Sequence, residues 1–217
     1  MDRRTFLFQS VAVTAQILAS ARYTLADMTS VPDGPAKHRF PNIVLKTHEN
    51  RQIRFYDDLV KGKHIVLNFM YASCPDSCPL QTANLALVQK ILGPRVGQDI
   101  FMYSVTLDPT HDTPDVLKEY ATRFGIQPGW EFLTGAAEDI ELLRRKVGFV
   151  NRDPVLDRDK SQHIGMVLYG NESLDRWSAC PALSTADNIA KYVLWMEART
   201  TKPAIGAVEQ GAALRPA

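Results

Sequence analysis

The chain has 217 residues, of which 45% are hydrophobic, and its formal net charge is +1. This length fits one globular domain with extensions, and the near-neutral charge gives no electrostatic footprint for nucleic acid. No apolar run reaches the ~20 residues of a membrane-spanning helix, so charge and hydropathy select no partner.

The amino terminus is similar to a twin-arginine export signal. Arg3 and Arg4 precede a mildly apolar stretch that ends at Ala19-Ser20-Ala21, a small-x-small pattern typical of a cleavage site. We expect residues 1–21 to direct the folded protein to the periplasm, or to keep it at the membrane if they stay uncleaved. The alternative is an ordinary amino terminus with a chance arginine pair. Residues 22–40 are interpreted as a linker.

The domain begins with strand patterns. Residues 43–47 and 52–55 alternate in hydrophobicity around a polar turn, which predicts a β-hairpin. Residues 57–63 are interpreted as a turn. Residues 64–71 contain an unbroken apolar core, which is typical of a central strand buried on both faces.

Two cysteines directly follow this strand, in Cys74-Pro75-Asp76-Ser77-Cys78-Pro79. At positions i and i+4, a helical turn places both sulfurs on one face, close enough to share a metal or to form a small-loop disulfide. The carboxyl end of a central strand is where open α/β folds bind ligands, and the following helix N-terminus favours thiolate over thiol. Thiolates bind copper(I), zinc or another sulfur. A metal site, a redox pair and a structural disulfide all remain open at this point.

Helix and strand patterns then alternate. A helix ending at Gly93-Pro94 is predicted from apolar residues at helical spacing, which are Leu80, Ala83, Leu87, Val88 and Ile91. Residues 151–162 are polar and charged and are interpreted as a mobile loop, and residues 200–217 as a loose tail. The other expected strands are 100–107, 131–133, 164–169 and 173–180, and the other expected helices are 115–124, 138–147 and 187–198.

This order of elements predicts an α/β domain over residues 41–199. A hairpin, a βαβα unit, a small βα insertion and a closing ββα unit correspond to a thioredoxin-like fold with an extra N-terminal hairpin. Its central mixed sheet is expected to be flanked by helices.

Several motifs, in the same order along the chain, closely resemble the Sco/SenC family of copper proteins. They are Phe69-Met70-Tyr71 with the cysteine loop, Ser104-Val105-Thr106-Leu107-Asp108-Pro109 with Asp112-Thr113-Pro114, Pro128-Gly129-Trp130 with Phe132-Leu133-Thr134-Gly135, and His163 before a strand. The resemblance covers about residues 40–198. It implies a thioredoxin-like protein that assists assembly of the copper centre of cytochrome oxidase.

The resemblance also implies a ligand set, because the family's metal ligands fall on Cys74, Cys78 and His163. Two thiolates and an imidazole make a three-coordinate copper(I) site that an added ligand adapts to copper(II), whereas a closed structural zinc site needs four ligands. We therefore expect a periplasmic, monomeric copper chaperone rather than an enzyme. The expected partners are a copper donor or thiol reductant and a copper-receiving oxidase subunit or other copper protein, with no nucleic acid.

The main alternative is a thiol-disulfide oxidoreductase that uses the redox-active pair Cys74 and Cys78 to reduce an oxidase subunit or another periplasmic protein. Disulfide exchange needs only the two cysteines, whereas stable metal binding needs His163 as well. The sequence thus offers His163 as the residue that separates the two functions.

Other residues near these motifs are ambiguous. Asp76 and Asp108 are interpreted either as supports or docking groups for the site or as ordinary loop and turn residues. His111 or Cys180 could supply the fourth ligand of a zinc site, but His111 is interpreted as a solvated turn residue. Cys180 lies outside the family pattern. The family usually follows the ligand histidine with Ser or Thr, but this chain has Ile164-Gly165, so the surroundings of the metal are expected to differ.

Overall fold

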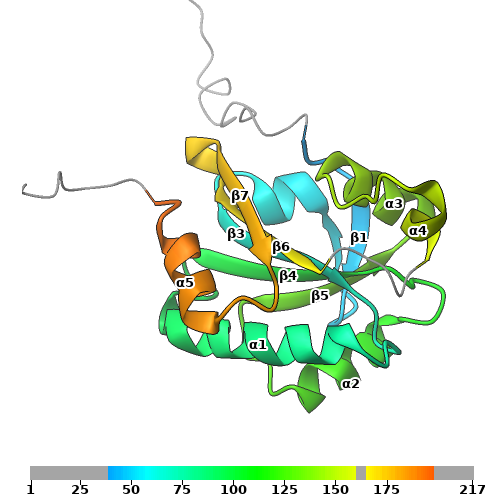
Figure 1. The fold of residues 1–217 in the computed structure, drawn as a ribbon, viewed down its shortest axis with the longest axis horizontal. Coiled ribbons are helices and arrows are strands. Elements are labelled where there is room, and N and C mark those ends of the chain that lie inside the picture. Colours follow the sequence, from blue (N-terminus) through cyan, green and yellow to red (C-terminus); the bar gives the residue numbers. More distant parts are fainter. Residues whose placement is uncertain (1–38, 160–164, 198–217) are drawn as a thin grey trace, which may run out of the picture. The chain divides into compact units, whose positions relative to one another are not determined.

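The computed structural model describes residues 39–159 and 165–197. These residues fold around a mixed β-sheet of seven strands (Figure 1). The strands are β1 (Val44–Thr47), β2 (Gln52–Arg54), β3 (His64–Met70), β4 (Ile100–Thr106), β5 (Trp130–Gly135), β6 (Met166–Asn171) and β7 (Arg176–Pro181). Their order is β2-β1-β5-β4-β3-β6-β7. β3 pairs in parallel with β4 and antiparallel with β6, so it lies inside the sheet.

Helices cover both faces of this sheet (Figure 1). They are η3 (Phe55–Val60), α1 (Ser77–Leu92), η4 (Gly93–Arg95), α2 (Pro114–Arg123), α3 (Ala137–Lys146), α4 (Pro154–Arg158), η6 (Glu172–Leu174) and α5 (Ala186–Leu194). α1, α2 and α5 pack on one face, and η3 and α3 on the other, which gives two hydrophobic clusters. The predicted α/β class is confirmed.

β3 holds these two clusters together because all of its residues are buried. Val66 and Met70 pack toward α1, whereas Ile65, Leu67 and Phe69 pack into the opposite cluster. Each such side chain contributes roughly 1.5–3 kcal/mol when it leaves water. The strand therefore provides a rigid base for the loop that follows it.

The predicted order of elements is also confirmed. β1 and β2 form the expected antiparallel hairpin, and β1 joins the edge of the main sheet by pairing with β5. β3, α1 and β4 form the parallel βαβ unit, and β6, β7 and α5 close the domain with an antiparallel pair and a helix. This is the thioredoxin-like arrangement.

Three segments differ from the sequence prediction. Residues 172–174 form the short helix η6, so the strand expected over residues 173–180 begins at Arg176. Residues 55–60 form the π-helical segment η3 instead of leading directly into a turn, because Phe55, Tyr56, Leu59 and Val60 all bury their side chains in one core. Within the expected loop 151–162, the structure contains the short helix α4. Its first turn is capped by the Asp153 carboxylate, which accepts a hydrogen bond from the Val155 amide at 2.8 Å.

The helix predicted after the cysteines is present as α1, but the face that it buries is not the apolar stripe from which it was predicted. Leu80, Leu87 and Ile91 are 63%, 55% and 47% exposed. The buried face consists of Cys78, Gln81, Thr82, Leu85, Val88, Gln89 and Leu92. Several of these are polar, which hid the true core face from a hydrophobicity pattern.

The boundaries of the domain are partly described. Phe40, at the end of the expected linker, is fully buried and packs against Phe55 and Trp177. The expected signal peptide, residues 22–38 of the linker and the tail 200–217 lie outside the described residues. Within the described ranges, no helix combines the length and apolar character needed to cross a membrane.

Candidate metal centre

The two-cysteine loop connects the end of β3 to the start of α1. The Cys74 amide donates a hydrogen bond to the Tyr71 carbonyl at 3.3 Å, which closes a turn. Cys78 lies in the first turn of α1, and its amide donates to Cys74 Sγ at 3.4 Å. Cys74 is 7% exposed and Cys78 is fully buried, and both carry thiols rather than a disulfide. The turn and the helix therefore bring both thiols to one small region.

The two thiols are electrostatically unequal. Burial raises the pKa of Cys74, but hydrogen bonds from the amides of Cys78 and Asp76, the Cys78 thiol and the Tyr71 hydroxyl bring that pKa below its ordinary value. Burial, with the neighbouring Cys74, raises the pKa of Cys78 to about 12. The arrangement thus favours a Cys74 thiolate that accepts a hydrogen bond from a protonated Cys78.

A buried carboxylate fixes the start of the loop. Asp112 is 1% exposed, and its Oδ2 accepts hydrogen bonds from the Ala72 amide at 2.9 Å and from the Thr106 hydroxyl. In the sequence, Asp112 stands in the motif Asp112-Thr113-Pro114, and in the structure its neighbour Thr113 caps α2. No local pattern reveals the role of Asp112, because the contact with Ala72 joins residues 40 positions apart.

The start of β6 lies opposite the end of β3, the strand from which the cysteine loop leaves. Val167 pairs with Asn68, so the antiparallel register continues toward Gly165 opposite the end of β3. The Gly165 carbonyl accepts a hydrogen bond from the Ala182 amide at 2.9 Å. His163 itself lies outside the described residues, and its assignment as a ligand stays a prediction.

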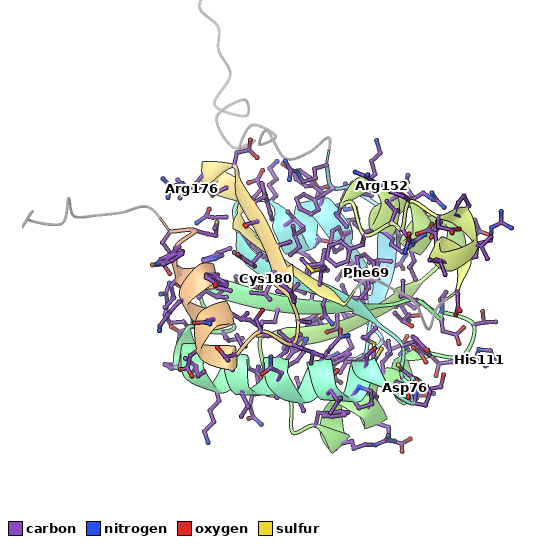
Figure 2. The ribbon with its side chains drawn as sticks, in the orientation of Figure 1. Phe69, Asp76, His111, Arg152, Arg176 and Cys180 are labelled. Atoms are coloured by element: carbon purple, nitrogen blue, oxygen red, sulfur yellow. The ribbon has the colours of Figure 1, made fainter. Side chains whose placement is uncertain are left out.

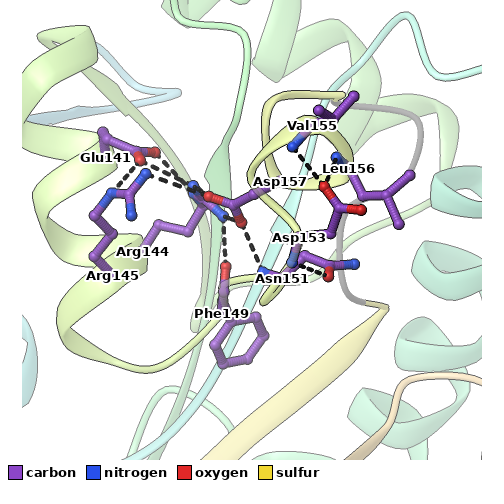
Figure 3. A network of polar contacts seen from close by, with 9 residues as sticks. All are labelled: Glu141, Arg144, Arg145, Phe149, Asn151, Asp153, Val155, Leu156 and Asp157. Atoms are coloured by element: carbon purple, nitrogen blue, oxygen red, sulfur yellow. Dashed lines mark hydrogen bonds and ion pairs between the residues drawn. The ribbon is translucent and has the colours of Figure 1, made fainter.

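An ion-pair network anchors the segment that leads toward His163 (Figure 3). Asp157 accepts hydrogen bonds from Arg144 Nη1 and Nη2 at 2.7 and 2.8 Å and from the Asn151 amide at 2.7 Å. Arg144 also donates to the Phe149 carbonyl at 2.7 Å. α3 is thereby fastened to the polar segment after it, six residues before His163.

The other residues considered from the sequence have structural surroundings of their own. Asp76 is exposed at the start of α1 (Figure 2). His111 is 76% exposed at its side chain, and its Nδ1 lies 3.0 Å from Asp108 Oδ2 within the turn after β4. Cys180 lies on β7, opposite Val167, and burial raises its pKa to about 11.

The donor atoms present fit a thiophilic metal. Two adjacent buried sulfurs, one of them favoured as a thiolate, are suitable ligands for copper(I) or zinc. Among the described residues, no group of three His, Cys, Asp or Glu side chains is arranged to hold a metal ion.

Curated relatives include one described as copper-binding and several described as SCO-type proteins. A putative copper-binding protein of Stutzerimonas stutzeri is 28% identical over 146 residues, which cover 67% of this chain and 70% of the relative. A SCO2-like protein of Rickettsia felis is 37% identical over 87 residues, which cover 40% of this chain and 41% of the relative. The second alignment thus spans less than half of that protein.

Solved structures support the fold. ScoI of Bradyrhizobium japonicum with copper bound superposes with a TM-score of 0.59 at 21% identity, over 73% of this chain and 99% of that one. BsSco, described as a member of the Sco family of cytochrome c oxidase assembly proteins with a disulfide switch, gives a TM-score of 0.58 at 21% identity, over 71% and 90% of the two chains. The SCO1/SenC family profile matches residues 45–173, which is more than half of the chain and includes the cysteine loop. The chain therefore belongs to the SCO1/SenC family.

Proposed function

We propose that this protein is a periplasmic copper chaperone that binds copper through Cys74, Cys78 and His163 and assists assembly of the copper centre of a cytochrome oxidase. The observation that carries the proposal is the pair of adjacent buried thiols at the start of α1, with the Cys78 amide on Cys74 Sγ at 3.4 Å. The copper-binding relative and the copper-bound ScoI structure support copper as the metal.

The loop suits a metal that must be both bound and released. Cys74 loses its proton more readily than Cys78 because its pKa is the lower of the two. A thiol that is still protonated has to lose its proton when it becomes a ligand, so copper binding releases protons. With His163 as the third ligand, the site would remain open to a further donor. An incoming thiol of a partner can then bind before a resident thiolate leaves.

The proposed compartment rests on the export signal at the amino terminus, and the proposed partners rest on copper as the metal that is transferred. The pair Arg3-Arg4 supports export of the folded protein to the periplasm. There, a copper donor or a thiol reductant would load or reduce the site, and an oxidase subunit or another copper protein would receive the metal.

A second candidate function is thiol-disulfide exchange with an oxidase subunit. The contact between Cys78 and Cys74 favours it, because one thiolate beside a second thiol is the arrangement that disulfide exchange requires. Metal transfer and exchange would use the same two sulfurs and differ in their need for His163.

The test is to compare single variants of the three proposed ligands. Cys74→Ser and Cys78→Ser are expected to abolish tight copper binding. His163→Ala is expected to lose copper(II) binding and its thiolate-to-copper absorption while still forming the Cys74–Cys78 disulfide. The measurements are copper competition titration, visible spectra and thiol counting of the purified domain.

Cys180→Ser is the matched control, since Cys180 is also a buried thiol but lies on β7. This variant should bind copper as the wild type does. In cells, a His163→Ala strain with full oxidase copper content and activity would contradict the chaperone function and favour the reductase.

A further inference from the structure

Gln81 carries a buried polar atom that the fold does not use. It lies on the buried face of α1, one helical turn after Cys78, and is 3% exposed. Its Oε1 is buried and has no hydrogen-bond partner among the residues that the structure describes. Buried side-chain oxygens are nearly always hydrogen-bonded, because leaving water without a new partner is unfavourable. The position of this amide therefore needs a reason other than packing.

A second glutamine on the same helix shows what a structural role looks like. Gln89 is also buried, at 6% exposed, but both ends of its amide are used. Its Nε2 donates to the Gln127 carbonyl at 2.8 Å, and its Oε1 accepts from the Gln127 amide at 3.1 Å. α1 can thus bury a glutamine whose side-chain oxygen and nitrogen are both hydrogen-bonded. Gln81 differs from Gln89 because its side-chain oxygen lacks such a bond within the described residues.

Gln81 is a neighbour of Cys78 on the buried face of α1, beside the candidate metal centre. Residues three apart on a helix have Cβ atoms about 5–6 Å apart, so Gln81 and Cys78 share the face that looks toward the sheet. Across from α1, a Cβ at Gly165 would lie 2.8 Å from Gln81 Nε2. The absence of a side chain at Gly165 therefore leaves room for the amide, between the first turn of α1 and the start of β6.

We propose that Oε1 of Gln81 is an oxygen ligand for copper(II) in this centre, beside Cys74 and Cys78. This inference rests on the proposed copper-binding function. A neutral amide oxygen is a harder donor than a thiolate, so it stabilises copper(II) and adds little for copper(I), which soft thiolates already satisfy. Gln81 would thus adjust the relative affinity for the two oxidation states without adding charge.

The test compares Gln81→Leu with the matched control Gln89→Leu, using the purified chain with copper(I) and copper(II) as probes. Gln81→Leu should keep copper(I) affinity within about threefold of wild type and bind copper(II) at least about tenfold more weakly. Each tenfold loss specific to copper(II) raises the one-electron reduction potential by about 59 mV. The copper(II) electron paramagnetic resonance spectrum and the thiolate-to-copper absorption band should shift as well.

The metal-free proteins give a second, independent readout. Gln81→Leu should melt at the wild-type temperature or above it, because it removes a buried oxygen that has no partner. Gln89→Leu should melt at a lower temperature, because it leaves two backbone groups of Gln127 unpaired, and its copper(II) spectrum should match that of the wild type. Gln81→Glu restores an oxygen donor and should recover copper(II) binding relative to Gln81→Leu.

The outcomes separate this inference from the function on which it rests. If the wild type bound no copper, both would be overturned. If the wild type bound copper but Gln81→Leu kept the wild-type copper(II) affinity, potential and spectrum, the ligand role of Gln81 alone would be overturned. A fall in the melting temperature of metal-free Gln81→Leu equal to that of Gln89→Leu would also overturn it, since Gln81 would then be a structural residue.

Discussion

Replacing Asp157 by asparagine removes the negative charge from the network that fastens α3 to the segment ahead of His163 (Figure 3). The side chains of Arg144 and Asp157 are 10% and 6% exposed, and Arg144 donates to both carboxylate oxygens at 2.7 and 2.8 Å. Because an asparagine oxygen can accept only part of these bonds, the guanidinium loses its main buried partner.

The expected loss of stability depends on the partners that Arg144 keeps in the variant. Removing one partner of a buried ion pair typically costs about 3–5 kcal/mol. Arg144 keeps Glu141, whose carboxylate accepts from Nε and Nη2 at 2.8 and 2.9 Å but is 43% exposed. We therefore expect the lower end of the range, a loss of about 3 kcal/mol in the free energy of unfolding. For a chain of this size, that corresponds to a melting temperature lower by roughly 6–12 °C.

The same prediction has a pH dependence with a definite sign. Hydrogen bonds from Arg144 hold the pKa of Asp157 well below its usual range, against the opposing effect of burial. A depressed pKa contributes stability that is fully present above the unfolded value of about 3.9 and is lost as the pH falls toward the folded value. The difference in stability between the wild type and Asp157→Asn should therefore be constant near neutral pH and shrink below about pH 4.

Denaturant or thermal unfolding at pH 7 and at pH 3 measures both quantities. Asp153→Asn is the matched control, since Asp153 belongs to the same segment but is an exposed helix cap, and it should cost at most about 1 kcal/mol. A loss below 1 kcal/mol for Asp157→Asn at pH 7, or a difference that does not shrink on acidification, would refute the reasoning.

Three further predictions concern the site and its export. Asp112→Asn should loosen the cysteine loop and lower copper(I) affinity about tenfold, or about 1.4 kcal/mol; unchanged affinity in a competition titration would contradict this. Cys78→Ser should form a mixed disulfide with a small disulfide reagent at least about tenfold faster than Cys74→Ser, because Cys74 is the better-ionised thiol; equal rates by mass spectrometry would argue against it. Replacing Arg3 and Arg4 together by lysine should leave the precursor in the cytoplasm, and normal periplasmic accumulation on fractionation would exclude the twin-arginine route.

Much of the fold was predictable because its strands have strong one-dimensional patterns. The apolar run 64–71 indicated β3, and its burial on both faces is confirmed. The face of α1 was not predictable, since Gln81, Thr82 and Gln89 point inward while Leu80 and Leu87 are exposed. Their burial depends on partners distant in sequence, such as the Tyr120 hydroxyl 3.0 Å from Thr82 Oγ1.

In the candidate site too, features that lie within one short stretch were predictable, and features that depend on residues distant in sequence were not. Cys74 and Cys78 were identifiable because their spacing, their prolines and the preceding strand lie within one short stretch. Asp112, which supports the loop through the Ala72 amide, acts across a distance in sequence that no local motif covers. Gln81 could not be singled out from the sequence, because a buried oxygen without a partner among the described residues becomes visible only in three dimensions.

The two thiols are not equivalent for transfer, and their places in the fold indicate the order in which they would be exchanged. Cys78 is fully buried within the first turn of α1, whereas Cys74 precedes the helix and is 7% exposed. An incoming thiol of a partner therefore reaches the Cys74 side of a bound metal first. The thiolate with the lower pKa is also the better leaving group, and hydrogen bonds from the helix amides stabilise Cys74 as a free anion. If both thiols bind copper as proposed, both effects predict that Cys74 leaves the metal first and that Cys78 holds it until the partner has bound it.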